Sequence, residues 1–298
     1  MANFSIKDIL LDGLPAVTVV DIGAMAEGRN RYDALVEKGV AHVIGFEPEQ
    51  NEYKKLKARE DKNHTYLPYF VGNGQPATFH RCRYNGCSSL YRPDPQVIDL
   101  FTSIGTSENG NFQVVGTVEV ETIRLDDIQE IQSFDFLKID VQGAELDVLE
   151  GSSAKLNGAG VVEVEVEFVP LYDKQPLFAE IDIFMRKSGF FLHKLVDIAG
   201  RGIRPFVMDG NPFKPVSQLL WADAIYIKDF TRFDRLPPEM LLKIAVVLHE
   251  VYSSIDMVAF ALKAYDAQRG TTFHSDYMTR VTAVGKIDYS FINVKDWI

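Results

Sequence analysis

Three short apolar runs alternate with two helical segments in the first quarter of the chain, and this alternation constrains the fold more than any other feature. The runs are rich in β-branched or aromatic residues and end at a glycine, an acid or both; they cover residues 16–20, 41–46 and 66–71. The helical segments between them cover residues 32–38 and 51–60. Strands that alternate with helices at this spacing form a parallel sheet, so the sequence predicts a doubly wound α/β fold.

Further strands extend this pattern to about residue 230. They are predicted at residues 78–83, 117–123, 134–140, 161–169, 190–195 and 219–227, with a helix at 178–187. We therefore predict one domain over residues 1–230 with a mostly parallel sheet of seven strands. Residues 84–115 interrupt it as a turn-rich insertion, which indicates a functional loop or a lid. Residues 231–298 are predicted to form a helical C-terminal extension, with helices at 237–249 and from Ser253 or Ser254 to Gly270.

The residues directly after the strands indicate a cofactor with a nucleoside. Gly23 follows the first strand, where a glycine lets the backbone approach a ligand closely. Glu47 follows the second strand, where an acid accepts hydrogen bonds from a ribose diol. The segment from Gly23 to Gly28 lacks the G-x-G-x-x-G pattern, and no P-loop is present. Asp21 would repel a pyrophosphate but suits an ammonium or a sulfonium group. These features favour S-adenosylmethionine over a nicotinamide dinucleotide.

Three motifs resemble the FkbM-type methyltransferase family. They read VVDIGA at residues 19–24, GFEP at 45–48 and FLKIDVQGAE at 136–145. Residues 86–90 and 120–127 resemble the middle section of the same family, and the resemblance covers roughly residues 15–230. It implies a class I, Rossmann-like fold that uses S-adenosylmethionine, usually for O-methylation of sugars or small natural products. Two departures stand out: Gly23 and Gly28 are one residue further apart than in the family, and Gln142 replaces a frequent Glu.

The resemblance assigns site residues by position. Those expected at the methionine end of the cofactor are Asp21, Gly23 and Ala24. Glu47, followed by Pro48, would hold the ribose hydroxyls, and Gly72 and Asn73 would lie at the adenine edge. Asp140 and Gln142 would lie beside the sulfonium, while Ser88 and Ser89 either close over the cofactor carboxylate or are plain loop serines.

Asp140 is the first candidate for a general base or a metal ligand, and the sequence leaves open whether a divalent metal takes part. Lys138 shares its strand face with Asp140, so the two form either a catalytic pair or a structural ion pair. Glu167 ends the acidic face of the strand at 161–169 and either reaches the pocket or is a partly solvated residue. The spacing of His80, Cys82 and Cys87 fits buried thiols better than a zinc site.

The net charge of −11 argues against nucleic acid and anionic membranes as partners. No apolar run spans a bilayer, no signal peptide is evident, and two cysteines fit a reducing compartment, so we expect a cytoplasmic location. The expected partner is a small-molecule or glycan acceptor. The tail helices are predicted to pack on the domain or in a homodimer, or to form a substrate lid. A nicotinamide-dependent oxidoreductase and a non-catalytic cofactor-binding module remain as alternative functions.

Overall fold

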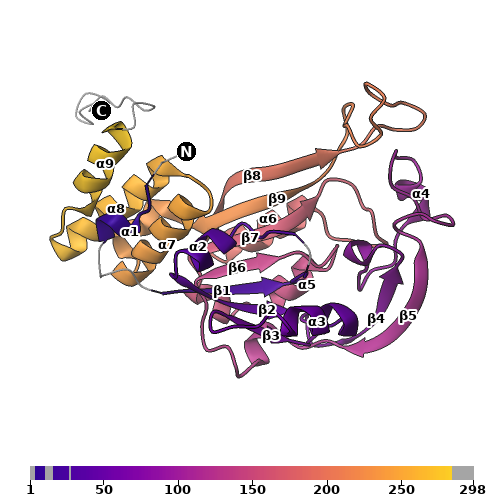
Figure 1. Ribbon diagram of the computed structural model, residues 1–298, viewed down its shortest axis with the longest axis horizontal. Coiled ribbons are helices and arrows are strands. Elements are labelled where there is room, and N and C mark those ends of the chain that lie inside the picture. The colour runs from indigo at the N-terminus through magenta and orange to yellow at the C-terminus, as the bar shows by residue number, and fades with distance from the viewer. Residues whose placement is uncertain (1–3, 11–15, 27, 284–298) are drawn as a thin grey trace. The chain divides into compact units, whose positions relative to one another are not determined.

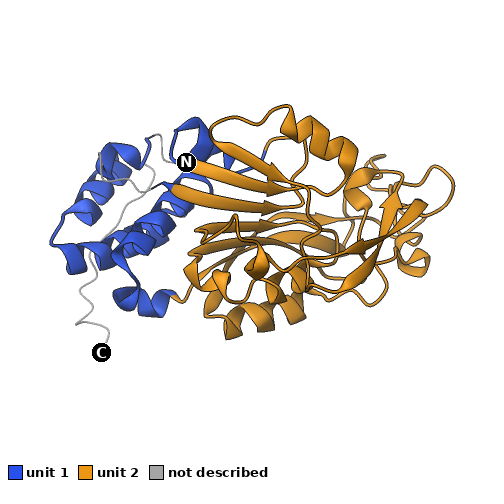
Figure 2. Ribbon diagram, turned by 90° about the horizontal axis from the view of Figure 1, so that it is seen from below, with its two compact units in different colours: residues 1–16, 30–40, 230–298 blue, residues 17–29, 41–229 orange. Residues whose placement is uncertain are grey.

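The computed structural model describes residues 4–10, 16–26 and 28–283, and these form two compact units (Figure 2). Unit 2 comprises residues 17–29 and 41–229, and unit 1 comprises residues 1–16, 30–40 and 230–298. Unit 1 thus joins the residues after Asp229 to two N-terminal segments, and the division into domains at residue 230 stays a prediction. Residues 284–298 of the predicted extension lie outside the described residues.

Unit 2 is built on a seven-stranded sheet in the order β3-β2-β1-β6-β7-β9-β8. The strands are β1 (Val17–Ile22), β2 (Ala41–Phe46), β3 (His64–Leu67), β6 (Phe136–Ile139), β7 (Val161–Glu167), β8 (Phe190–Gly200) and β9 (Leu219–Lys228). The first five are parallel to one another, whereas β9 is antiparallel to both β7 and β8. The predicted mostly parallel sheet with a class I methyltransferase topology is therefore confirmed (Figure 1).

Shorter elements connect and flank these strands in unit 2. The helices are α3 (Gln50–Lys57), α4 (Pro95–Ile98), α5 (Glu145–Glu150) and α6 (Phe178–Lys187), with 3-10 turns at Asn85–Cys87, Leu125–Asp127 and Lys155–Gly158. A separate antiparallel hairpin consists of β4 (Pro76–Cys82) and β5 (Val114–Glu121). The main core joins the apolar side chains of the central strands to those of α5 and α6, because each parallel strand must bury both of its faces.

Unit 1 is helical. Its elements are α1 (Lys7–Leu10), α2 (Asp33–Glu37), a 3-10 turn at Phe230–Arg235, α7 (Pro238–Glu250), α8 (Ile255–Arg269) and α9 (Phe273–Ala283). The apolar face predicted for the first tail helix is buried, with Leu241, Ile244 and Leu248 inaccessible to solvent. His249 bridges two segments of the unit, since its ring nitrogens contact the Tyr277 hydroxyl and the Phe4 carbonyl at 2.9 Å each.

Residues 84–115 fold as a small subdomain of unit 2. Cys82, Cys87, Ile98 and Phe112 pack with Tyr172 in a second apolar core. Both cysteines are free and buried, and burial raises the pKa of the Cys82 thiol to about 11. The insertion expected to be irregular thus packs in a second core together with Tyr172 and Leu220 from later in the chain, which the turn-rich sequence does not reveal.

Candidate active site

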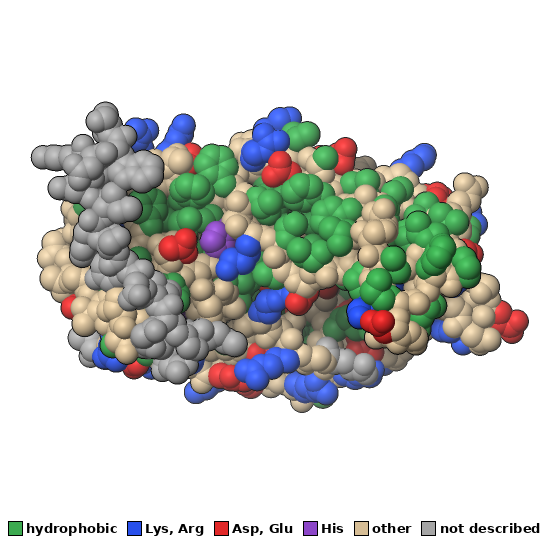
Figure 3. All heavy atoms as spheres, turned by 90° about the horizontal axis from the view of Figure 1, so that it is seen from above, with side chains coloured by type: hydrophobic (Ala, Val, Ile, Leu, Met, Phe, Trp, Pro, Cys, Tyr) green, Lys and Arg blue, Asp and Glu red, His purple; other side chains and the backbone are tan. Residues whose placement is uncertain are grey.

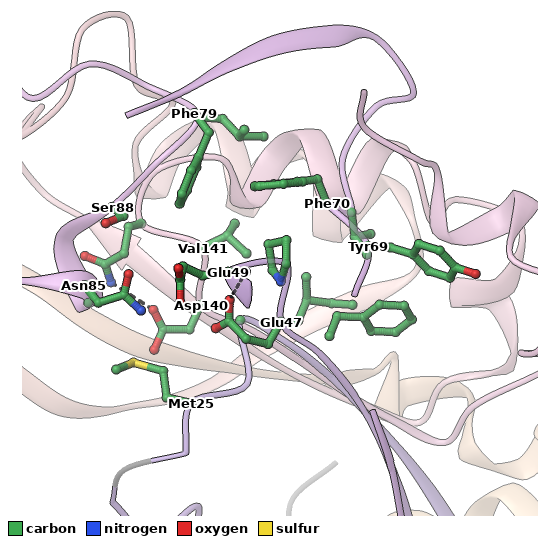
Figure 4. Close-up of a pocket in the computed structure, with 18 of the residues that line it drawn as sticks. Met25, Glu47, Glu49, Tyr69, Phe70, Phe79, Asn85, Ser88, Asp140 and Val141 are labelled. Atoms are coloured by element: carbon green, nitrogen blue, oxygen red, sulfur yellow. Dashed lines mark hydrogen bonds between the residues drawn. The ribbon is translucent and has the colours of Figure 1, made fainter. Parts of the chain in front are cut away.

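A cavity of about 250 Å³ opens at the carboxyl ends of β1, β2 and β6 (Figure 4). Ligands bind at this edge in open α/β sheets, where the strand order reverses. The predicted site residues that line it are Gly23, Glu47, Pro48, Ser88, Asp140 and Gln142. Their roles toward a ligand remain predictions, but the fold brings these six residues from three strand ends and the insertion to one place.

Gly23 closes the first strand in a conformation that only glycine adopts easily. Its φ is +91°, and a Cβ atom there would lie 1.9 Å from the backbone oxygen of Asp140. The ends of β1 and β6 approach so closely because the Asp140 amide donates to the Ile22 carbonyl at 3.0 Å, and the Gly23 amide in turn donates to the Phe46 carbonyl of β2 at 3.1 Å. Because Gly23 has no side chain, the backbones at the ends of β1 and β6 can meet beside the cavity.

We expect Gly23→Ala to weaken binding of S-adenosylhomocysteine at least about 10-fold more than Gly28→Ala does, as measured by titration calorimetry. Gly28 is the matched control, since its φ is +92° but no atom of the described residues lies within 4 Å of a Cβ placed there. Both substitutions carry the strain of a positive φ, about 1–2 kcal/mol. Only Gly23→Ala also displaces the strand ends, so equal affinities of the two variants would contradict this assignment.

Glu47 is a buried acid at the end of β2. One carboxylate oxygen accepts a hydrogen bond from the Glu49 amide at 2.6 Å, drawn as a dashed line in Figure 4. Burial raises the pKa of Glu47 to about 7, against the lowering effect of that hydrogen bond, and the nearby acids Glu49, Glu52 and Asp21 raise it further. A buried carboxylate of this kind gains from a ligand that donates hydrogen bonds to it, as a ribose diol does.

Because ribose hydroxyls donate to the ionised form of Glu47, we expect S-adenosylhomocysteine to bind more tightly as pH rises from about 6 to about 8. Below pH 7 the acid must release its proton before it accepts these bonds, and above pH 7 it is already ionised. Calorimetric titrations across this range measure the effect. In Glu47→Gln the affinity should be lower and this pH dependence should disappear; an unchanged dependence would place the titrating group elsewhere.

The loop after β6 is held by a residue to which sequence reasoning assigned no role. Glu145, at the start of α5, is almost fully buried and accepts hydrogen bonds from the amides of Val141 at 2.9 Å and Gly143 at 2.9 Å. Burial raises the pKa of Glu145 to about 7, against the lowering effect of these bonds. The sequence pattern that could have indicated this role is an acid in the first turn of a predicted helix, where backbone amides lack partners.

Gln142 joins two carboxylates across this loop. It has a positive φ of +60°, and its amide nitrogen donates to Asp140 Oδ1 at 2.9 Å and to Glu165 Oε2 at 2.6 Å. The Tyr172 hydroxyl donates to the Gln142 side-chain oxygen at 3.3 Å. The neutral amide therefore fixes the orientation of Asp140, which a Glu at this position would instead repel.

Lys138 contacts both Asp21 and Asp140, with Nζ–Oδ distances of 3.2 Å and 3.8 Å. Asp21 and Lys138 are register partners on β1 and β6, and Lys138 is the register partner of Glu163 on β7. Burial alone would lower the pKa of Lys138, but Asp21, Asp140 and Glu163 outweigh it and raise that pKa. The closer pairing is with Asp21, and neither Asp21 nor Lys138 lines the cavity.

Glu167 is buried at the end of β7 and is not among the residues lining the cavity. Its Oε2 atom has no hydrogen-bond partner among the described residues, and neither has Gln175 Nε2. Burial is the main cause that raises the pKa of Glu167, and Glu145 adds to it. A role in catalysis for Glu167 stays a prediction.

Four further predicted cofactor residues lie outside the cavity lining. Ala24 packs in a small apolar core with Leu56 and Tyr66. Asn73 donates to the Asp147 carboxylate at 3.1 Å, and the preceding Gly72 lies against Thr122. Ser89 is buried and accepts a hydrogen bond from the Tyr91 amide, whereas Ser88 lines the cavity and accepts one from the Cys82 amide.

Aromatic side chains form a wall of the cavity that sequence reasoning missed. Phe70 and Phe79 meet edge to face with ring centroids 5.0 Å apart, and Tyr69 and Tyr84 also line the cavity. Phe79 comes from the β4–β5 hairpin, which lies outside the main sheet. The rule that ligands bind at the carboxyl ends of the sheet strands therefore does not point to it. Among the described residues, no three His, Cys, Asp or Glu side chains group as metal ligands would.

Several solved structures resemble this chain, but only distantly. A search of curated protein sequences gave no significant match. The solved structures that resemble the chain include a precorrin-6y C5,15-methyltransferase from Geobacter metallireducens, with 12% identity, a TM-score of 0.37, and 75% of this chain and 84% of that chain covered. An S-adenosylmethionine-dependent methyltransferase from Aquifex aeolicus has 12% identity, a TM-score of 0.30, and 75% and 90% coverage. Likenesses this distant add nothing beyond the topology described above.

The family model described as the methyltransferase FkbM domain matches residues 21–192. This range is more than half of the chain, and it begins at the end of β1 and contains every residue that lines the cavity. The chain therefore belongs to the FkbM family of S-adenosylmethionine-dependent methyltransferases.

Proposed function

We propose that this methyltransferase transfers the methyl group to a hydroxyl of a small molecule or a glycan. The observation that carries the proposal is the Asp140 carboxylate, which lines the cavity with 38% of its side chain exposed and is held in place by Gln142. A hydroxyl acceptor must lose its proton during methyl transfer, and a positioned carboxylate is a suitable base for it.

The residues present fit S-adenosylmethionine. Gly23 lines the cavity without a side chain, and the buried Glu47 has a raised pKa that hydrogen-bond donors from a ligand would offset. When bound, the cofactor supplies an electrophilic methyl group. Gly23 and Glu47 would bind and orient it, and Phe70 and Phe79, which line the same cavity, would exclude water from it. Membership in the methyltransferase family replaces the nicotinamide-dependent alternative.

The remaining expectations about partners are part of this proposal. The acceptor is a small molecule or a glycan rather than nucleic acid, the enzyme works in the cytoplasm, and the C-terminal helices form a homodimer. Since Leu241, Ile244 and Leu248 are buried, such a dimer would need exposed side chains such as Phe260 on α8. Light scattering on the full chain measures its mass directly.

The test is a transfer assay with methyl-labelled S-adenosylmethionine and a panel of sugars, glycans, hydroxylated natural products, amines and thiols. We expect label in a methyl ether that survives mild base. Label on nitrogen or sulfur alone would refute O-methylation. A thermal-shift assay with S-adenosylhomocysteine and with NAD accompanies it, and we expect the first ligand to raise the melting temperature. Binding without transfer to any acceptor would instead support a non-catalytic module.

A further inference from the structure

Exposed apolar side chains concentrate on the loop that joins β8 to β9. Half of the large hydrophobic residues that are exposed in the described chain, eight of sixteen, lie between residues 198 and 219. The two most exposed are Phe206 at 68% and Phe213 at 62%. Scattered exposed apolar residues are ordinary, but a contiguous exposed group marks a binding surface for a protein, a membrane or a ligand.

This loop is held in place rather than loosely folded. Ile203 forms a β-bridge with Phe101, the Arg204 amide donates to the Leu100 carbonyl at 2.8 Å, and Thr102 Oγ donates to the Pro212 carbonyl at 2.7 Å. The backbone is thus pinned to residues 99–104, and the apolar side chains project from it. We call Leu100, Ile203, Phe206, Val207, Phe213 and Val216 the apolar tip; each of them is exposed.

The local charge of this loop is opposite to that of the whole protein. Residues 198–219 and the segment 99–104 that carries Leu100 together contain Arg201, Arg204 and Lys214 and two acids, Asp99 and Asp209, so the local charge is 3 − 2 = +1 against −11 for the chain. The negative charge of the protein is therefore not spread evenly along the chain. A basic apolar projection on an acidic protein matches the interface of an anionic bilayer, where apolar groups insert and cations meet headgroups.

The apolar tip lies at the same edge of the sheet as the cavity. Because β9 is antiparallel to both β7 and β8, β8 runs parallel to β7 and ends at the carboxyl edge. The β8–β9 hairpin extends at this edge toward the end of unit 2 that carries α4 (Figure 1). Hydrophobic side chains gather at the same end of unit 2 in Figure 3. The projecting β8–β9 hairpin can insert its apolar tip into a lipid surface directly, whereas a partner protein would need a groove that fits it.

We infer that the apolar tip docks unit 2 on the surface of an anionic phospholipid bilayer, with the carboxyl edge of the sheet turned toward the lipid. No helix of the described residues could span a membrane. Binding is peripheral in this proposal, by insertion of Phe206 and Phe213 into the interface and attraction of Arg201 and Arg204 to the headgroups, while Lys214 is paired with Asp209.

The test is flotation of the full chain with vesicles of phosphatidylcholine containing one quarter phosphatidylglycerol, and with phosphatidylcholine alone. We expect wild-type protein to bind the anionic vesicles about 10-fold more tightly than Phe206→Ser/Phe213→Ser does, and high salt to weaken binding. The matched control is Val115→Ser/Val118→Ser, two residues of β5 exposed by 56% and 48%, which should bind like wild type.

Two results would overturn the inference. One is wild-type protein that does not float with anionic vesicles, or that floats no better than Phe206→Ser/Phe213→Ser. The other is a wild-type dimer in light scattering that this variant converts to a monomer while neither binds vesicles, since the apolar tip would then be a self-association surface. Circular dichroism and S-adenosylhomocysteine binding, which the variant should retain, show that the fold is intact.

Discussion

Asp140→Asn is expected to lower the rate of methyl transfer to a hydroxyl acceptor about 100- to 10,000-fold, the range typical for loss of a general base. Asparagine has nearly the same shape and can still accept the hydrogen bond that Gln142 donates at 2.9 Å, so the loop after β6 should keep its conformation. What is lost is the group that takes the proton. The measurement is turnover with the acceptor found in the labelled-methyl assay.

Cofactor binding separates this effect from a general disturbance of the site. S-adenosylhomocysteine should bind Asp140→Asn within about 3-fold of wild type if the carboxylate acts on the acceptor proton. The matched control is Asp147→Asn, because Asp147 lies on the adjacent α5, bonds to Asn73 and Tyr91, and does not line the cavity. Equal loss of turnover in both variants, or unchanged turnover in Asp140→Asn, would contradict the role of Asp140 as a base.

Lys138→Met should lower the free energy of unfolding by about 3–5 kcal/mol, because it removes the cation from a buried row of charges. Asp21 is fully buried, and Lys138 lies 3.2 Å from it and 3.8 Å from Asp140. The register places Glu163 on the other side of Lys138. Without the ammonium group these acids face one another across the centre of the sheet. Urea unfolding followed by circular dichroism measures the change.

Two further variants make this prediction specific. Lys187→Met, at the exposed end of α6, should leave the unfolding midpoint unchanged. The double variant Asp21→Asn/Lys138→Met removes both members of the closest pair, so it should recover part of the stability lost in Lys138→Met. If Lys138→Met unfolds at the same urea concentration as wild type, the row of charges does not stabilise the sheet.

The fold could be predicted where periodicity and turn signals agree. The second strand at 41–46 and the helix at 178–187 have the expected bounds, since each is a short apolar or amphipathic run closed by a clear stop. The third strand was expected at 66–71 but spans His64–Leu67, because pairing with β2 ends where Phe46 meets Leu67. Residues 69–71 then leave the ladder and line the cavity.

Other elements escaped prediction for physical reasons. The strand expected at 190–195 extends to Gly200, and register shifts after Leu192 and Val196 disrupt the alternation by which a strand is recognised. The helix α9 (Phe273–Ala283) was not predicted, since its residues are mostly polar and only Tyr277 and Val281 are buried. Tertiary packing within unit 1, rather than a strong apolar pattern, defines that helix.

The sequence by itself determined the order of strands and helices, the family, and the strand ends from which a site is built, because these depend on local periodicity and on residue types at turns. Only the tertiary structure decided which side chains meet. The register of β1, β6 and β7 places Lys138 beside Asp21 and Glu163, and the β4–β5 hairpin brings Phe79 to the cavity. Such contacts join residues that are distant in the chain, and strand register and core packing, which no local pattern records, set their distances.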